Sequence, residues 1–541
     1  MRILLAALAL IALAACKPSD PKNPETWIAR LGDTDAKVRV QAVQELRKLK
    51  AKQAGQPVAA LLKDAQVRED AALALQDLGG PGEVQPLLDA VDTTVGAGSD
   101  QATRSANRTN AKIADALGAI GDAKAGPALL RLARSKDDLV RLSAVQALGL
   151  LGPAAAKEAV PELARMVDDD SVPPLLIKKA IVALGQMNDP AAIPALEHGL
   201  VLERQGVSFL PESSFALFLL GPAAVEPLLK LAQDQDLGYT VWAKEHDRSA
   251  AGTYAKAALV LGDLGDLRAV PALLGKLKYS DPDPIPSTAK LLTNLVRQFA
   301  ANALGRLRAK EAAAPILSLV QTKDASDLDL VSFATEALVW IGDRSQAKEL
   351  VKRAGSGAFA LRVQCAQAAA LLGEPALAKD VAALAAREEK GASSGCQKQA
   401  AELGLPEGDP KGSCAQLGAQ FSQLVPALEA AKACEAQAPC WSGKLSDPSG
   451  IVRARAAIEL GRLGDASAVP ALVKAVATTD LPARVAAIRA LEWLMPVQAA
   501  RTQLKQASGQ LAAQLAAEQG RVQFVRVNEE LRRLQVSLAR L

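Results

Sequence analysis

A short phrase of similar sequence recurs along most of this chain. It reads ALVLGDLGD at residues 258–266, AIELGRLGD at 457–465 and ALGAIGD at 116–122, and an apolar segment with a proline near its start follows each copy. The equivalent prolines lie 33 to 44 residues apart, at Pro86, Pro127, Pro161, Pro194, Pro227, Pro271 and Pro315. A repeat of this size is one supersecondary unit that cannot bury its apolar face alone, so neighbouring units stack into a continuous array.

The residues inside one repeat predict a pair of helices. Val140, Ala144 and Leu148 are apolar at helical spacing. Gly152 then ends the first helix, because glycine accepts the left-handed conformation of a C-cap, and a proline suits the first turn of the second helix. Half of the residues are hydrophobic but only 3% are aromatic, which favours small side chains where helices pack closely. The pattern therefore predicts an all-α solenoid, with a set of separate helical bundles as the alternative.

Several first helices begin with an Asp-x-x-Val-Arg motif or a related form. The motif is complete at residues 137–141, and Val452-Arg453 follows Asp447 in a similar way. Together with the repeat length, this motif resembles HEAT repeats over residues 25–496, in about thirteen helix pairs. The resemblance implies that aspartates and arginines of adjacent repeats form a ladder of polar contacts. The alternative is that these charges lie on a solvated helix face.

The N-terminus has the features of an export signal. Arg2 is followed by the apolar residues 3–15 and then by Cys16. The apolar run is too short to span a bilayer as a helix, for which about 20 residues are needed. Its end, Leu-Ala-Ala-Cys at 13–16, resembles the lipobox of bacterial lipoproteins, in which the preceding peptide is removed and the cysteine is acylated. The alternative is an ordinary signal peptide with a chance cysteine.

The lipobox resemblance divides the start of the chain into two parts. Residues 1–15 are then a lipoprotein signal peptide, and residues 16–24, which contain three prolines, are a lipidated tether. The resemblance implies that Cys16 is the lipidation site and that the lipid bilayer is one partner. Lys17 stands where an aspartate would favour the inner membrane, so we expect an outer-membrane protein. The predicted location is the bacterial cell envelope, with the protein facing the periplasm or the cell surface.

Three stretches of additional residues interrupt the repeat period, at 92–110, 235–249 and 279–290. All are predicted between the second helix of one repeat and the first helix of the next. They would lie on one edge of a solenoid, where insertions often mark a binding face. Tyr239 and Trp242 of the second stretch are candidate partner-binding residues, because exposed aromatic side chains are good anchors. The alternative is that these rings pack the loop onto its own repeats.

An irregular part of the array, residues 391–447, contains Cys396, Cys414, Cys434 and Cys440. Exported proteins form disulfides in oxidising compartments. Of the three possible pairings we favour Cys396–Cys414 and Cys434–Cys440, because each closes a loop around one helix end. Half of a zinc site is the alternative, but no Cys-x2-Cys pair or nearby histidine supports it. Cys365 occupies the small-residue position of a first helix and is predicted to be a buried thiol.

The repeat pattern stops after Pro496. Residues 497–541 contain leucines at helical spacing, among them Leu504 and Leu511, and then Leu531 and Leu534. These stripes predict a helical C-terminal cap that covers the exposed face of the last repeat. A partner-binding helix is the alternative.

Residues suited to catalysis are sparse in this sequence. Its two histidines occur as Glu197-His198 and Glu245-His246, the reverse of the His-Glu ligand pairs in HEAT-like deoxyhypusine hydroxylases. No nucleophile elbow or zinc-protease motif occurs, and a net charge of +4 argues against nucleic-acid binding. We therefore predict a membrane-anchored, non-catalytic protein–protein interaction scaffold without a cofactor or metal. The alternatives are an envelope enzyme or accessory subunit of the HEAT-like lyase type, and a purely structural envelope spacer.

Overall fold

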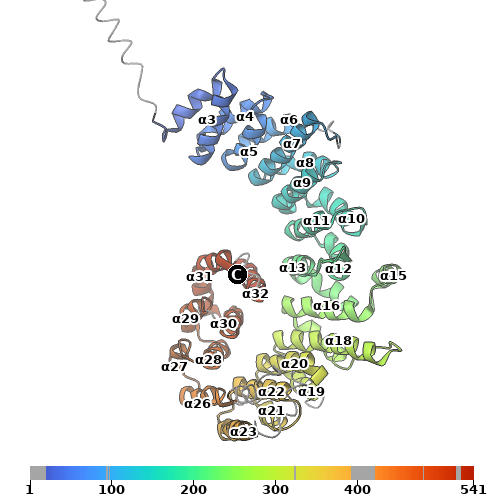
Figure 1. Cartoon of the computed structure of the whole chain (residues 1–541), viewed down its shortest axis with the longest axis vertical. Coiled ribbons are helices and arrows are strands. Elements are labelled where there is room, and N and C mark those ends of the chain that lie inside the picture. The colour runs from blue at the N-terminus through green and yellow to red at the C-terminus, as the bar shows by residue number, and fades with distance from the viewer. Residues whose placement is uncertain are drawn as a thin grey trace, which may run out of the picture. The chain divides into compact units, whose positions relative to one another are not determined.

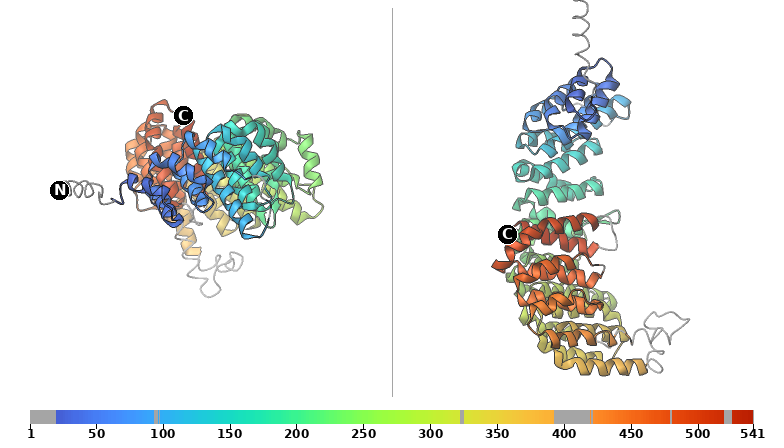
Figure 2. Two further views of the ribbon diagram at one scale, coloured as in Figure 1. Left: turned by 90° about the horizontal axis from the view of Figure 1, so that it is seen from above. Right: turned by 90° about the vertical axis from the view of Figure 1, so that its left-hand side faces the viewer.

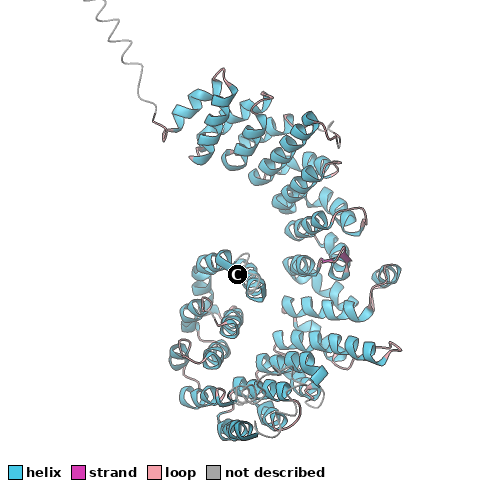
Figure 3. Cartoon of the chain, in the orientation of Figure 1, coloured by secondary structure: helices cyan, strands magenta, loops and turns pink. Residues whose placement is uncertain are grey.

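The computed structural model describes residues 20–92, 96, 98–321, 325–391, 419, 421–478, 480–518 and 525–540. These residues form helices joined by short turns, with one small hairpin in the described part of the chain (Figures 1 and 3). Contacts divide the chain into two compact units, Met1–Leu220 (unit 1) and Gly221–Leu541 (unit 2). The predicted lipidation site Cys16 and the predicted disulfide partners Cys396 and Cys414 lie outside the described residues.

Unit 1 is a stack of helix pairs that begins with the short helix α2 (Pro24–Ile28). The pairs are α3 (Ala36–Lys48) with α4 (Gly55–Ala60), α5 (Arg68–Leu78) with α6 (Val84–Asp89), α7 (Gln101–Ile120) with α8 (Gly126–Ala133), α9 (Asp138–Leu151) with α10 (Ala156–Asp168), and α11 (Pro174–Met187) with α12 (Ile193–Val201). The antiparallel strands β1 (Glu203–Arg204) and β2 (Val207–Ser208) then lead into α13 (Leu210–Leu220). Each first helix packs on the first helix of the next pair, so the core is continuous.

Unit 2 continues the same architecture. It contains α14 (Val225–Ala232), the inserted helix α15 (Leu237–Glu245), and the pairs α16 (Ala250–Leu264) with α17 (Val270–Lys276), α18 (Pro286–Arg306) with α19 (Ala313–Leu319), α20 (Leu328–Ile341) with α21 (Ala347–Ala354), and α22 (Phe359–Leu372) with α23 (Ala378–Gly391). Then follow α26 (Val425–Cys434) with α27 (Ala438–Lys444), α28 (Gly450–Leu463) with α29 (Val469–Ala475), α30 (Leu481–Leu494) with α31 (Gln498–Glu518), and α32 (Val525–Ala539). The stacking of successive helices within each unit can be followed in Figure 2.

The Gly-Asp step of the repeated phrase forms the turn between the two helices of a pair. Gly121 ends α7 in the left-handed conformation, with φ of 76°, which glycine adopts without steric penalty. Asp122 then accepts a hydrogen bond from the backbone N–H of Lys124 at 2.9 Å and starts the next turn. Pro127 lies in the first turn of α8. The same turn recurs at Gly265–Asp266 and Gly464–Asp465.

Glycine–alanine contacts set the spacing between consecutive first helices. A Cβ atom placed on Gly118 of α7 would lie 2.7 Å from the Cα and Cβ atoms of Ala147 in α9. The corresponding distance from Gly185 of α11 to Ala216 of α13 is 2.8 Å. The helix backbones therefore approach as closely as a missing side chain allows, which explains why the repeats are rich in small residues and poor in rings.

The predicted ladder of aspartates and arginines forms in both units. Arg39 of α3 pairs with Asp64, which precedes α5, at 2.6 Å. In unit 2, Arg453 of α28 pairs with Asp480, the N-cap of α30, at 2.7 Å. Arg141 instead pairs with an aspartate of its own helix at 3.2 Å. The ladder is thus confirmed where the next repeat supplies an aspartate within reach.

Two helices of the predicted cap region, α31 and α32, pack against the preceding repeats. α31 packs on α29 and α30 as the second helix of the last pair, and α32 packs on α30 and α31. The leucines of both predicted stripes are fully buried, namely Leu504, Leu511, Leu531 and Leu534.

In the first insertion, α7 already begins at Gln101, so the second half of the stretch 92–110 extends a first helix.

Two helical stretches of the described chain, Asp138–Asp168 and Leu210–Ala232, are long and apolar enough by composition to cross a membrane. In each, 61% of the apolar window is buried inside the fold. Burial in the repeat core accounts for their composition, because first and second helices both bury an apolar stripe.

A candidate protein-binding edge

The second insertion forms the short helix α15, which the structure holds against unit 2. Asp236 caps the helix by accepting from the backbone N–H of Tyr239 at 2.9 Å. The Tyr239 side chain is buried, and its hydroxyl lies 3.1 Å from Oγ1 of Thr253 in α16. Tyr239 therefore attaches the helix to its own repeat, which is the placement described by the alternative interpretation of these rings.

The three rings of this segment pack on one another, with Trp242 stacked on His246 and tilted against Tyr239. The centroid of Trp242 lies 5.5 Å from that of Tyr239 and 4.7 Å from that of His246. His246 also donates from Nδ1 to the carbonyl oxygen of Trp242 at 2.8 Å. Because the rings pack among themselves, the helix presents aliphatic residues instead: Leu237 is 77% exposed and Val241 is 57% exposed. Leu237 and Val241 are four residues apart, and this spacing in the sequence places them on one face of a helix.

Two tyrosines, Tyr254 and Tyr279, hold the third insertion against its repeat. The rings of Tyr254 in α16 and Tyr279 meet edge to face at 5.5 Å, and the Lys276 ammonium lies 3.2 Å from the centroid of Tyr254. Burial lowers the pKa of Lys276 below its usual value, partly opposed by Asp234. Tyr279 donates to Asp281 at 2.7 Å. An ammonium over an aromatic face is itself attractive, so the start of this insertion is firmly attached.

Tyr254 connects the second and third insertions. Its hydroxyl donates to Asp234, just before α15, while its ring packs on Tyr279. Burial and Asp234 raise the pKa of Tyr254 above its usual value, so it stays a hydrogen-bond donor. α18 already begins at Pro286, so the end of the third insertion is part of a first helix. Ile285 of this insertion is 58% exposed, and Leu291, which follows it in α18, is 69% exposed.

Leu237, Val241, Ile285 and Leu291 together define what we call the insertion edge. Both segments that bear them project from the same side of unit 2 in Figure 1. Burying one such side chain against a partner contributes about 1.5–3 kcal/mol. A protein with a complementary apolar surface is therefore the kind of ligand that this edge suits.

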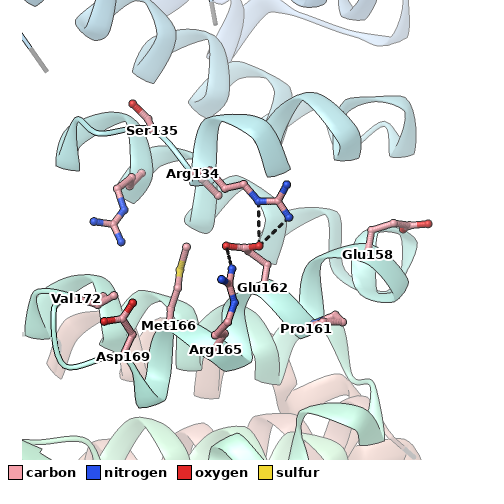
Figure 4. Close-up of a pocket in the computed structure, with 11 residues that line it drawn as sticks. Arg134, Ser135, Glu158, Pro161, Glu162, Arg165, Met166, Asp169 and Val172 are labelled. Atoms are coloured by element: carbon pink, nitrogen blue, oxygen red, sulfur yellow. Dashed lines mark hydrogen bonds and ion pairs between the residues drawn. The ribbon is translucent and has the colours of Figure 1, made fainter. Parts of the chain in front are cut away.

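Unit 1 contains a hollow of different chemistry, of about 630 Å³, beside α8 and α10 (Figure 4). Arg134 donates from two nitrogens to Oε2 of Glu162, at 2.9 and 2.7 Å, and Arg165 donates to Oε1 of the same carboxylate. The two arginine side chains are 57% and 71% exposed. Their remaining N–H groups can reach a polar or acidic group of a partner.

The two histidines lie apart from any cluster of metal ligands. His198 Nδ1 is 2.9 Å from Oδ1 of Asp168, whereas His246 is stacked on Trp242. Among the residues that the structure describes, no three histidine, cysteine, aspartate or glutamate side chains converge on a position for a metal ion.

The cysteines occupy two kinds of environment. Cys434 and Cys440 form a disulfide, with Cα atoms 5.3 Å apart, which is one of the two predicted pairs. Cys365 is a free thiol and fully buried, as its place in the helix predicts. Burial raises the pKa of the Cys365 thiol to about 12, opposed by Arg353, so the thiolate needed for reaction is scarce at neutral pH.

Comparison with known families agrees with the helix-pair architecture. The profile of HEAT repeats matches residues 24–106, 99–175, 140–207 and 443–518, and that of the PBS lyase HEAT-like repeat matches 296–322. The chain is therefore a HEAT-repeat protein, an all-α solenoid. No curated protein sequence matches it.

Several solved structures are similar in fold. Kap95p, in a structure describing how its binding switches the loops of RanGDP, is 11% identical, with 95% of this chain and 71% of that chain covered and a TM-score of 0.47. Yeast importin-beta (Kap95p) is 12% identical, with coverages of 91% and 69% and a TM-score of 0.42. The CpcE–CpcF complex of phycocyanin lyase from Nostoc sp. PCC7120 is 20% identical, with coverages of 53% and 93% and a TM-score of 0.24.

Proposed function

We propose that this HEAT-repeat protein is a lipid-anchored scaffold of the bacterial cell envelope that binds protein partners and performs no chemistry of its own. The observation that carries the proposal is the insertion edge. Leu237, Val241 and Ile285 lie on inserted segments, and Leu291 lies near the start of the long helix α18. The cap of α15 and the contact between Tyr254 and Tyr279 hold these segments in place. Single exposed aliphatic residues are common on protein surfaces, but attached insertions that present several of them are typical of binding surfaces.

The anchoring part of the proposal rests on the sequence of residues 13–16, which resembles a lipobox. Acylation of Cys16, followed by the short tether 17–24, would keep the first repeats near the bilayer, because eight extended residues reach less than about 30 Å. A scaffold held there would concentrate partners at the membrane surface by raising their effective concentration.

Site-specific photo-crosslinking tests the binding surface. A photoreactive residue placed at Val241 or Ile285 should form adducts with the same partner in intact cells. The matched control is Lys352 on α21, which is 80% exposed and lies away from the insertions, where it pairs with Glu349 of its own helix. The double variant Leu237→Asp/Val241→Asp should abolish capture while leaving the far-ultraviolet spectrum unchanged. Equal adducts from Lys352, or unchanged capture by the double variant, would contradict the assignment of the edge.

Metabolic labelling tests the anchor separately. An alkyne-bearing fatty acid should label the wild-type protein, and Cys16→Ser should lose both the label and sedimentation with membranes. Cys365→Ser is the matched control, because it removes a buried thiol far from the signal. Labelling that survives in Cys16→Ser would refute lipidation at this residue.

A further inference from the structure

Unit 2 turns back on itself. We call α16 to α22 the first arm and α28 to α32 the second arm; within the unit, α28, α30 and α32 lie opposite α16, α18 and α20 (Figure 1). Side-chain contacts between the arms join residues that are 84 to 270 positions apart in the sequence. These contacts close the inner face of unit 2, and their chemistry differs from that of the repeat core.

A group of buried charges joins α32 to the first arm. Arg306 of α18 lies 2.8 Å from Asp263 of α16 and 3.1 Å from Glu530 of α32. Arg533 of α32 lies 2.8 Å from the second oxygen of Asp263. Arg489 of α30 completes the group by pairing with Glu530 at 2.7 Å. All five side chains are less than a tenth exposed.

Glu492 of α30 pairs with Arg489 at 3.1 Å. The group therefore has three arginines and three carboxylates, and we call these six residues the latch cluster. Burial opposes ionisation of Glu530, but Arg306, Arg489 and Arg533 outweigh it and hold its pKa at about 2. The three arginines thus keep Glu530 ionised inside the protein, whereas burial raises the pKa of Glu492 above its usual value, partly opposed by Arg489.

A second set of contacts places cations from α28 at the ends of first-arm helices. Arg462 donates to the carbonyl oxygen of Val339 at 2.6 Å, beside the C-cap Gly342 of α20. Arg455 donates to the carbonyl oxygen of Leu371 near the end of α22. Helix C-termini carry partial negative charge, so two of these ends are stabilised by arginines from the opposite arm.

One ring contact bridges the two arms: Trp340 of α20 and Trp493 of α30 meet edge to face, with centroids 5.7 Å apart. Beside this contact lies a cavity of about 420 Å³ between the arms, with Trp340 and Leu371 on the first-arm wall and Ile458 and Val485 on the second-arm wall. First helices within each arm pack closely on one another, as α16 does on α18 and α28 on α30. Apart from the contact of Trp340 with Trp493, the ends of long charged side chains join the arms.

An ionic junction has a different energy balance from an apolar one. Dehydrating buried charges offsets most of their mutual attraction, so a complete set contributes little net stability. Opening the junction would rehydrate all six charges of the latch cluster at once. Losing a single partner while the arms stay closed, by contrast, leaves an uncompensated buried charge, which is strongly unfavourable. Such a junction opens or closes as a whole.

We propose that unit 2 exchanges between a closed and an open turn, and that the latch cluster holds it closed by fixing α32 to α16 and α18. Opening separates α28 and α30 from α20 and α22 and exposes both walls of the cavity, including Trp340. The exchange between the closed and open turn requires no partner at the insertion edge. Its test is therefore independent of the proposed function.

Distance measurements on the full-length protein test this proposal. Spin labels are attached through non-canonical residues at Gly275 of α17 and Gly509 of α31, where an added side chain meets nothing within 4 Å. At low salt the wild-type protein should show a single label-to-label distance, that of the closed turn. Glu530→Gln should raise the population of a longer distance about tenfold or more, because it leaves the arginines in excess. Glu349→Gln is the matched control, since it removes a carboxylate from a surface ion pair of α21.

Two further measurements keep the test decisive if Glu530→Gln fails to fold. Raising the salt concentration should lengthen the wild-type distance, because ions screen the charges that the open state exposes, whereas sucrose should not. The double variant Arg306→Gln/Glu530→Gln restores charge balance and should be more closed than Glu530→Gln. A wild-type distance that does not respond to salt, or a double variant as open as the single one, would overturn the proposal.

Discussion

The close glycine–alanine contacts between repeats make a strong prediction about one glycine. Adding a methyl group at Gly185 places a Cβ atom 2.8 Å from both Cα and Cβ of Ala216, well inside van der Waals contact. Overpacking of this kind costs about 1–3 kcal/mol, because the two helices must move apart. Alanine is the better helix former by about 1 kcal/mol. We therefore expect Gly185→Ala to lower the local free energy of unfolding by about 1 kcal/mol despite its higher helix propensity.

A second glycine isolates the packing contribution. Gly509 lies within α31 and has no neighbour within 4 Å of an added Cβ atom. Gly509→Ala should therefore show only the gain in helix propensity and raise the local free energy of unfolding by about 0.5–1 kcal/mol. The difference between the two variants is the cost of moving α11 away from α13, about 1–3 kcal/mol.

Hydrogen exchange is the suitable assay, because repeat arrays open locally and a single unfolding midpoint would average over both units. Amides of α11 and α13 should exchange faster in Gly185→Ala, and amides of α31 should exchange more slowly in Gly509→Ala. If Gly185→Ala slowed exchange as much as Gly509→Ala does, the idea that glycine–alanine contacts set the repeat spacing would be refuted.

Three other predictions concern charges and the disulfide. Arg453→Ala should destabilise α28 and α30 by about 1 kcal/mol, because the partly buried pair with Asp480 is lost. Amides of α28 and α30 should then exchange faster, and unchanged exchange would contradict a role for the ladder. Since the pKa of Glu530 is held at about 2 in the folded state, its stabilisation is complete above its unfolded pKa of about 4.3 and is lost as pH falls toward 2. Below about pH 4.3, the free energy of unfolding of Glu530→Gln should therefore fall less steeply with pH than that of the wild-type protein. Parallel curves of unfolding free energy against pH for the two proteins would contradict the lowered pKa of Glu530. Reducing Cys434–Cys440 should speed exchange in α26 and α27 by an amount equivalent to about 2 kcal/mol, and exchange unaffected by reductant would count against the bond.

The candidate site could be predicted only in part. The additional residues at 235–249 and 279–290 mark the insertion edge in the sequence, because they break a regular period. Which side chains face outward was not predictable from residue type. Tyr239 has the chemistry of a partner anchor, but its hydroxyl lies beside that of Thr253 and its ring packs on Trp242 inside the fold. Leu237 and Val241 of the same helix are the exposed side chains. Ring packing against a neighbouring helix depends on a surface that the insertion itself does not encode.

The sequence by itself determined the helix pairs, their turns and their stacking. Each of these depends on interactions within one repeat or with the next one, as when Gly121 ends a helix and Asp122 starts the following turn. Only the tertiary structure decided how unit 2 closes. Arg306 and Glu530 are 224 residues apart, and their meeting depends on the summed rotation of all the repeats between them. A small rotation per repeat is invisible in any single repeat, but its accumulated value decides which distant charges become partners.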